Sequence, residues 1–312
     1  MLVVYNTCGI SKNDIQNKNY YCQCLDSILS QKFKHFRCVW SSCLNDPSVE
    51  KELKSKYGNY ISYSFIDEIL PVNITFNHSV LKMVQKTGNF DSYIYLDCGV
   101  DIGNDVYTLQ KLYEIYKSGP YAMVGAECDD DMGIRAWFKV DFLSEISNGQ
   151  HFVIPIGKCL NLHAQLFSDE LFKKYNNRLL PDIFYKFGTE STFSFLCAAI
   201  QKKWIFHNGL RPHHNHYVDG ASSGFPITFC DGAYWNHTFR CDKTMWLICQ
   251  DKEGIDAGFG YEELEKVLLH KESEFDENYF CKNDRLYPWL KKTLYHSKNT
   301  FDYSTIKHRF FL

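Results

Sequence analysis

The residues best suited to metal and phosphate chemistry lie in one short stretch, 93–105. There the chain reads YIYLDCGVDIGND, so that apolar and aromatic residues lead directly into three aspartates, Asp97, Asp101 and Asp105. Carboxylate oxygens are the ligands that Mg²⁺ and Mn²⁺ prefer, and Asp97 is the first candidate. Asp101 could supply a second carboxylate if the chain turns at Gly99, where glycine permits either a positive φ or the close approach of a phosphate. The alternative is that Asp101 and Asp105 are solvated turn residues that cap the next helix.

A second polar cluster, RPHHNHYVD at residues 211–219, could complete such a site. Neutral imidazole binds divalent metals together with carboxylates, so His214 or His216 is a candidate ligand. Arg211 could hold a diphosphate through two parallel hydrogen bonds. The histidine spacing matches no standard zinc motif, and a polar surface loop is the alternative interpretation.

The elements that must position these residues form a repeating pattern. Apolar runs alternate with helical patterns over the first two thirds of the chain, which predicts an α/β fold with a mostly parallel sheet flanked by helices. The aspartates fall at the carboxyl end of the fourth expected strand, where open parallel sheets bind ligands. We expect one domain over residues 1–240 and a Lys/Glu-rich helical extension over 241–312 packed on it. The first four strands are expected at 1–7, 36–43, 60–66 and 93–97, and the first three helices at 19–33, 47–58 and 73–88.

The composition excludes several classes of protein. The chain has 312 residues, 45% of them hydrophobic, which is enough for a large buried core. Its net charge is −3 and it has no long run of like charges, so neither nucleic acid nor an anionic membrane surface is an expected partner. No stretch reaches the roughly 18 apolar residues of a membrane span, and the N-terminus has no signal peptide pattern, so we expect a cytoplasmic protein. Thirteen cysteines without a C-x-x-C pair suit reduced thiols.

The order of these parts resembles the nucleotide-sugar glycosyltransferases of the GT-A fold, and among them the inverting family 2. Residues 27–40, SILSQKFKHFRCVW, look like that family's first helix and second strand. Residues 77–101 look like its asparagine-bearing helix, glycine turn and strand running into an Asp-x-Asp motif. Residues 188–204, GTESTFSFLCAAIQKKW, stand where its acidic catalytic motif opens a helix. Two places differ, because residues 41–43 are Ser-Ser-Cys where the family has acids, and Cys98-Gly99 interrupts Asp-x-Asp.

The resemblance implies a transferase that moves a sugar from a nucleotide-diphosphate donor to a hydroxyl of a glycan or glycoconjugate. Residues 1–105 would bind the nucleotide and 106–240 the acceptor. Charge that develops on the departing diphosphate is usually stabilised by Mn²⁺ or Mg²⁺, which Asp97, Asp101 and a histidine would hold. Asp97 could instead contact the ribose. Glu190 would be the base that deprotonates the acceptor, although a glutamate also suits the first turn of any helix.

Three further polar residues could line the nucleotide site. Asn6 and Thr7 end the first expected strand, where short polar side chains could contact a base or ribose, or simply form a turn. Asn77 could face the nucleotide or hydrogen-bond a neighbouring loop.

Two other functions fit the same residues. A transferase relative that has lost catalysis would bind carbohydrate or a nucleotide sugar, in keeping with the interrupted motif at Cys98-Gly99. A metal-dependent phosphoester hydrolase would use the same acids and histidines, but the sequence has no recognisable spacing for a second metal ion.

Overall fold

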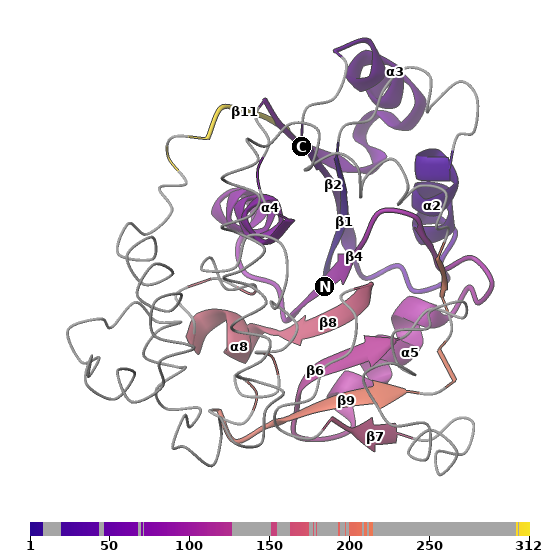
Figure 1. The fold of residues 1–312 in the computed structure, drawn as a ribbon, viewed down its shortest axis with the longest axis vertical. Coiled ribbons are helices and arrows are strands. Elements are labelled where there is room, and N and C mark those ends of the chain that lie inside the picture. Colours follow the sequence, from indigo (N-terminus) through magenta and orange to yellow (C-terminus); the bar gives the residue numbers. More distant parts are fainter. Residues whose placement is uncertain are drawn as a thin grey trace, which may run out of the picture.

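The described part of the chain is a nine-stranded sheet with helices on both faces and a separate two-stranded ribbon, β5 with β10 (Figure 1). This computed structural model describes residues 1–8, 20–43, 47–67, 70, 72–126, 151–154, 163–174, 177, 179, 193, 197, 200–207, 209–210, 212–214, 304 and 306–312. The strands are β1 (Leu2–Cys8), β2 (Arg37–Cys43), β3 (Ser62–Ile66), β4 (Ser92–Leu96), β5 (Val100–Asp101), β6 (Tyr121–Ala126), β7 (His151–Val153), β8 (Ala164–Ser168), β9 (Lys203–His207), β10 (His213–His214) and β11 (His308–Phe311). The helices are α2 (Tyr20–Leu29), α3 (Pro47–Tyr57), α4 (Val72–Thr87), α5 (Thr108–Lys117) and α8 (Asp169–Lys174), with a 3₁₀ turn, η1, at Gly58–Tyr60.

The strand order in the large sheet is β11-β3-β2-β1-β4-β8-β6-β9-β7. Strands β3, β2, β1, β4, β6 and β9 all run in one direction, whereas β11, β8 and β7 run in the other. The expected α/β fold with a mostly parallel sheet is therefore confirmed. The four strands expected from the first apolar runs are β1 to β4, and the first three expected helices are α2, α3 and α4.

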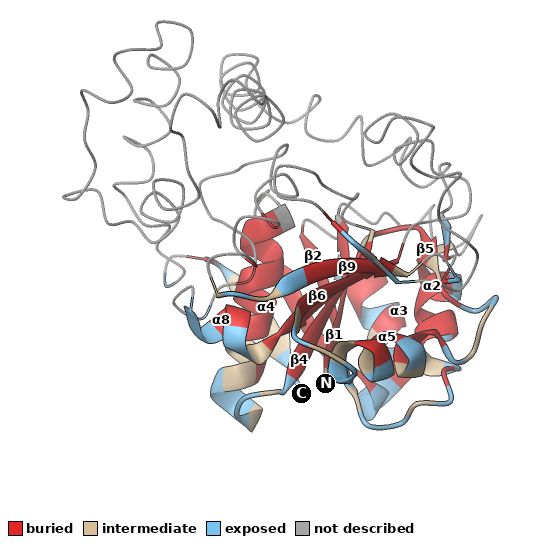
Figure 2. Cartoon of the chain, turned by 90° about the horizontal axis from the view of Figure 1, so that it is seen from below, coloured by how far each residue is buried: buried red, intermediate tan, exposed pale blue. Residues whose placement is uncertain are grey.

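Alternate side chains of the central strands enter two separate cores, because successive residues of a strand point to opposite faces. Val3 and Tyr5 of β1 pack in one core with α2, α3 and α5, whereas Leu2 and Val4 pack in the other with α4 and α8. Figure 1 shows these two groups of helices on opposite sides of the sheet. Figure 2 shows the central strands buried along their length, which explains why they read as continuous apolar runs.

The described residues bear on two expectations from composition, that the cysteines are reduced and that no segment spans a membrane. The six cysteines whose side chains are described are all free and buried, in agreement with reduced thiols. Among the helices that the structure describes, none combines the length and the apolar character that crossing a membrane requires.

The end of the chain differs from the expected helical extension. Residues 308–311 form β11, which pairs antiparallel with β3 at the edge of the sheet, from His308 opposite Ile66 to Phe311 opposite Tyr63. A four-residue strand carries too little periodic pattern to be distinguished from the Lys/Glu-rich sequence before it, and the open edge of β3 supplies the backbone partners that fix its conformation. Residues 241–303 lie outside the described ranges, so the rest of the extension stays a prediction.

Candidate active site

Polar residues gather at one edge of the sheet. Because β3, β2, β1 and β4 are mutually parallel, their carboxyl ends lie together at this edge. The polar residues that end or directly follow these strands are Asn6, Thr7, Ser41, Ser42, Asp67 and Asp97. Side chains of the first turns of α4 hydrogen-bond to the same edge, as Thr75 does to Asn6. This is the edge where the sequence predicts a ligand site.

Asp97 directly follows β4 and is partly exposed. Its Oδ1 atom accepts two hydrogen bonds, from the hydroxyl of Tyr95 at 2.8 Å and from the backbone N–H of Cys98 at 2.9 Å. Its own backbone N–H donates to the carbonyl of His163 at 2.9 Å, which joins the end of β4 to the start of β8. The carboxylate is therefore held in one orientation by groups of its own strand and turn.

The chain turns sharply after Asp97 and then forms the ribbon of β5 and β10. Gly99 has φ of +82°, and Val100 N–H donates to Asp97 O at 3.3 Å, so the turn needs the positive φ that glycine permits. In the antiparallel ribbon, Asp101 lies opposite His213 and Val100 opposite His214. The aspartate and histidine clusters of the sequence are thus adjacent in space.

The donor set at this point has the chemistry of a Mn²⁺ or Mg²⁺ site. Asp97 and Asp101 would offer hard carboxylate oxygens, and β10 carries the backbone of His214 beside them. No group of three or more ligand side chains is close enough to hold a metal within the described ranges. The side chains of His214 and His216 lie outside those ranges. The residues present therefore fit the cation by donor type, as two carboxylates of an incomplete set.

Asp101 also has a local structural role. Its Oδ1 accepts the N–H of Gly103 at 2.7 Å, which closes a turn, and a Cβ on Gly103 would lie only 3.0 Å from that oxygen. Burial, and next the negative charge of Asp101, raise the pKa of the Cys24 thiol to about 12, so Cys24 is a neutral neighbour of the ribbon. One oxygen of Asp101 thus stabilises a turn, as expected if Asp101 is a turn residue and not a metal ligand.

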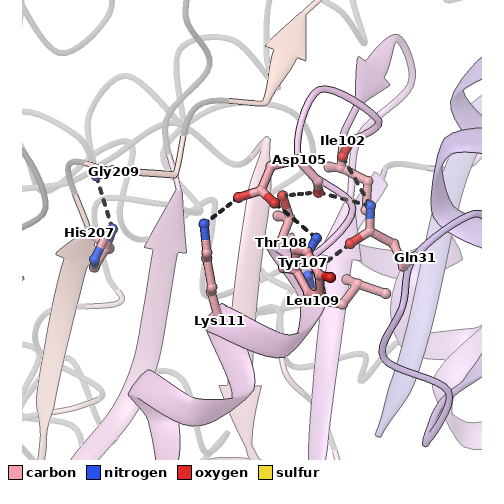
Figure 3. A network of polar contacts seen from close by, with 9 residues as sticks. All are labelled: Gln31, Ile102, Asp105, Tyr107, Thr108, Leu109, Lys111, His207 and Gly209. Carbon is pink, nitrogen blue, oxygen red and sulfur yellow. Dashed lines mark hydrogen bonds and ion pairs between the residues drawn. The ribbon is translucent and has the colours of Figure 1, made fainter.

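Asp105 organises the turn that leads into α5 (Figure 3). Its Oδ1 accepts the N–H of Tyr107 at 2.9 Å, its carbonyl accepts the N–H of Thr108 at 3.1 Å, and its Oδ2 pairs with Lys111 at 2.5 Å. Burial opposes ionisation of the carboxyl, but the hydrogen bonds from Lys111 and Tyr107 and the charge of Lys111 leave its pKa below the ordinary value. These contacts make Asp105 a turn residue of α5.

Asn6 and Thr7 are buried at the end of β1. Asn6 is 5% exposed, and its Oδ1 accepts the hydroxyl of Thr75 at 3.1 Å. Thr7 is 2% exposed, and its hydroxyl accepts the indole N–H of Trp40 at 2.8 Å and donates to the carbonyl of Ser41 at 3.4 Å. Asn6 therefore joins the end of β1 to α4, and Thr7 joins it to β2.

Asn77 is also buried and bonds to another segment. Its Oδ1 accepts the N–H of Leu179 at 3.1 Å, which joins α4 to a residue far along the chain. This contact is the second of the two roles that the sequence suggests for Asn77.

The Ser-Ser-Cys end of β2 is part of an internal contact that sequence reasoning missed. Ser41 is fully buried, its hydroxyl lies 2.8 Å from that of Ser79 on α4, and Ser79 also donates to the carbonyl of Thr75 at 2.9 Å. Small hydroxyls at 41, 75 and 79 allow α4 to pack closely on the strand end. The sequence indicated this contact only through the absence of acidic residues at 41–43, and that absence does not identify the residues of α4 as the partners.

Three predicted site residues, Glu190, Arg211 and His216, lie outside the described residues, and only the backbone of His214 is described. Of the predicted set, the structure bonds Asn6 to α4 and Thr7 to β2. It places Asp101 opposite His213 of β10, and Asp97 at the start of the turn that leads to β5.

Comparisons with known proteins give matches among solved structures. No protein-family model and no curated protein sequence matches the chain. A structure of GalNAc-T7 with UDP, GalNAc and Mn²⁺ superposes with a TM-score of 0.53 at 9% identity, covering 94% of this chain and 58% of that one. S. aureus TarS superposes with a TM-score of 0.51 at 10% identity, covering 94% and 55%. The mannosyltransferase PcManGT from Pyrobaculum calidifontis, in complex with GDP-Man and Mn²⁺, gives 0.49 at 11% identity, covering 95% and 74%.

The similarities to GalNAc-T7 and TarS show the fold. Identities of 9 to 11% are too low to carry a residue's role from one chain to another. The chain has the α/β fold of the GT-A nucleotide-sugar glycosyltransferases, as the order of its sequence motifs predicted.

Proposed function

We propose that the protein is an inverting glycosyltransferase, which moves a sugar from a nucleotide-diphosphate donor to a hydroxyl of a glycan or glycoconjugate with the help of Mn²⁺ or Mg²⁺. The observation that carries this proposal is the position of Asp97. Its oriented carboxylate lies at the carboxyl edge of the parallel strands, next to the ribbon where Asp101 and His213 are paired. Two solved structures that share the fold, GalNAc-T7 and TarS, support it, and the first contains UDP and Mn²⁺.

The predicted site residues divide into two groups. Asp97 and Asp101 would hold the cation and the diphosphate oxygens, with His214 or His216 as a further ligand and Arg211 on the diphosphate. Asn6, Thr7 and Asn77 are buried and bonded to protein groups. Their contribution to nucleotide binding would therefore be mainly to hold in place the strand and helix that lie beneath the nucleotide.

The reaction requires that the negative charge on the departing diphosphate be stabilised and that the acceptor hydroxyl lose its proton. The cation, when bound, stabilises the negative charge that develops on the departing diphosphate. Glu190 would accept the proton of the acceptor hydroxyl as its oxygen attacks the anomeric carbon from the face opposite the leaving group, which inverts the configuration. Asp97 would keep its carboxylate aligned through Tyr95 and the Cys98 N–H, so little reorganisation is needed when the donor arrives.

The test is donor binding by the full chain with and without the cation. We expect a panel of UDP- and GDP-sugars to contain a donor that raises the melting temperature with Mn²⁺ and not with EDTA, and that is slowly hydrolysed. Asp97→Asn should abolish the Mn²⁺-dependent shift. Asp26→Asn is the matched control, because Asp26 is 52% exposed on α2 and its ion pair with Lys56 lies at the surface, so it should keep the Mn²⁺-dependent shift of wild type.

Two results would count against this function. A wild-type protein that shows no shift and no hydrolysis across the panel would contradict donor binding, and an Asp97→Asn protein that keeps the full Mn²⁺ response would remove Asp97 from the site. For the base, Glu190→Gln should lower turnover while donor binding is unchanged.

One observation favours a second candidate, a relative that binds donor without turning it over. Cys98-Gly99 stands in place of a second adjacent carboxylate, and one oxygen of Asp101 is engaged with Gly103. A donor that binds with or without metal and is never consumed, in the presence of any acceptor, would support this candidate.

A further inference from the structure

A single buried side chain, Gln31, joins three segments of the chain next to the candidate site (Figure 3). It is fully buried just beyond the C-terminal end of α2. Its Nε2 lies within hydrogen-bond distance of three carbonyls, those of Ser27 at 3.3 Å, Ile102 at 3.0 Å and Asp105 at 3.2 Å. Its Oε1 accepts the backbone N–H of Leu109 at 3.2 Å. Both ends of the amide are thus committed to backbone groups, mostly of the loop that follows β5.

Ser27 holds the same loop from the last turns of α2. Its hydroxyl donates to the carbonyl of Cys24 at 2.7 Å and accepts the N–H of Ile102 at 3.1 Å. Ile102, which directly follows β5, therefore has its N–H bound by Ser27 and its carbonyl bound by Gln31. The backbone N–H of Lys32 adds a bond to the carbonyl of Val106 at 2.8 Å.

This loop is the only described connection between β5 and the rigid helix α5. The ribbon of β5 and β10 has two residues on each strand, which is too short to hold itself in place. On one side it is tied to Asp97 through the Gly99 turn, and on the other side it depends on the contacts of residues 102–109 with α2. Gln31 and Ser27 therefore supply a second anchor for Asp101, in addition to the Gly99 turn that joins it to Asp97.

We propose that Gln31, with Ser27, is a positioning residue that fixes Asp101 and its partner strand β10 at the distance from Asp97 that a cation and diphosphate require. This inference rests on the proposed function. Gln31 would contact neither the nucleotide sugar nor the cation. It acts by donating to the buried carbonyl of Ile102, and it adds a bond to the carbonyl of Asp105, which also accepts from Thr108.

The experiment compares three full-length variants with wild type. Gln31→Met keeps the length of the side chain and removes every hydrogen bond, whereas Gln31→Glu keeps an acceptor for the Leu109 N–H and removes the donors. Gln110→Met is the matched control on α5, because Gln110 bonds at the surface to Glu114 at 2.7 Å. Two quantities are measured: amide hydrogen exchange of peptides that cover residues 100–109, and the Mn²⁺ concentration that gives half of the donor-induced rise in melting temperature.

We expect exchange over 100–109 to be about tenfold faster in both Gln31 variants, with the strands β1 and β4 unchanged, because the lost bonds are those of the loop. The Mn²⁺ concentration at half effect should rise by about tenfold, which a loss of overall stability alone would not produce. Gln110→Met should match wild type in both measurements. If Gln31→Met is too unstable to purify, Gln31→Glu carries the test.

Unchanged exchange over 100–109 would overturn the inference, whatever the donor data show. Faster exchange with an unchanged Mn²⁺ requirement would also overturn it, because the loop would then move without affecting the site. A wild-type protein that responds to no donor and no Mn²⁺ would instead contradict the proposed function, and the exchange measurement would still decide whether Gln31 holds β5.

Discussion

His78 should make the protein less stable in mild acid, and the size of the effect follows from its surroundings. It lies on α4 and is 1% exposed, with Nδ1 3.5 Å from the hydroxyl of Ser64 and its ring 4.5 Å, edge-on, from that of His308 on β11. Nε2 has no hydrogen-bond partner among the described residues. Burial, and then the neighbouring His308 and Lys82, lower the pKa of His78 to about 3.

The sign of the pH dependence follows from comparing the folded and unfolded chains. The imidazole has its ordinary pKa of 6.5 when the chain is unfolded and a pKa of about 3 when it is folded, so between these values only the unfolded state binds the proton. The stability contributed by the neutral ring is therefore complete above pH 6.5 and is lost as the pH falls towards 3. For one proton the slope is about 1.4 kcal/mol per pH unit, which gives a loss of about 2 kcal/mol between pH 8 and pH 5.

The assay is urea unfolding of wild type and His78→Gln at pH 8, 7, 6 and 5. Gln cannot take up a proton, so the difference in free energy of unfolding between the two proteins should shift by about 2 kcal/mol over this range, in favour of the variant at low pH. Carboxylates elsewhere titrate in both proteins and cancel in the difference. His35→Gln, at an exposed position, should show no such shift. Parallel pH profiles for wild type and His78→Gln would refute the reasoning.

Two further changes test polar contacts of the sheet, one on the central strand β1 and one on the edge strand β11. Thr7→Val keeps the shape of the side chain but leaves the Trp40 indole N–H without its acceptor, so urea unfolding should show a loss of about 1 to 3 kcal/mol, and Thr7→Ser a smaller one; equal losses would argue against this hydrogen bond. Arg309→Ala removes the paired contacts of β11 with Glu50 and Asp67, and because Arg309 is 40% exposed the loss should be only about 1 kcal/mol, with Arg309→Lys between. Faster proteolysis of the C-terminus should accompany it, and an Arg309→Ala protein as stable and resistant as wild type would show that pairing with β3 alone holds the strand.

The sheet could be predicted from sequence because its strands are buried on both faces. Residues such as Val3 and Tyr5 face one core while Leu2 and Val4 face the other, so the apolar run is continuous and easily recognised. The turn at Gly99 could also be predicted, since an aspartate and glycines directly after such a run indicate the end of a strand. In these places a local pattern determines the local structure.

The ribbon of β5 and β10 could not be predicted in the same way. Each strand has two residues, and the pairing of Asp101 with His213 joins segments that are far apart in the sequence. Motifs for metal ligands depend on short spacings in the sequence, so they cannot detect this pairing, although aspartates and histidines are residue types that bind metals. The strand β11 was missed for the same reason, because its partner β3 lies at the other end of the chain.

A polar residue at a strand end has the same sequence signature whether it faces a ligand or another segment. The sequence allows Thr7 to contact a nucleotide or to form a turn, and in the structure its hydroxyl accepts the indole N–H of Trp40. Asn77 bonds to the backbone of Leu179. Which of these roles holds depends on the residues that the fold places next to the side chain. Trp40 counts as apolar when hydrophobic periodicity is analysed, although its indole N–H needs an acceptor when it is buried.

The distribution of exposure along the edge places the reactive part of the candidate site. At the ends of β1 and β2, Asn6, Thr7 and Ser41 are all at most 5% exposed and are bonded to α4 or to each other's strands. Asp97 and Asp101, at the end of β4 and on β5, are partly exposed. Charged phosphate oxygens and a cation need groups that solvent and ligand can reach, so their contacts should concentrate on the β4 and β5 side, while β1 and β2 shape the floor. The proposed function thus depends less on the missing acids of β2 than on the geometry that Gln31 gives to β5.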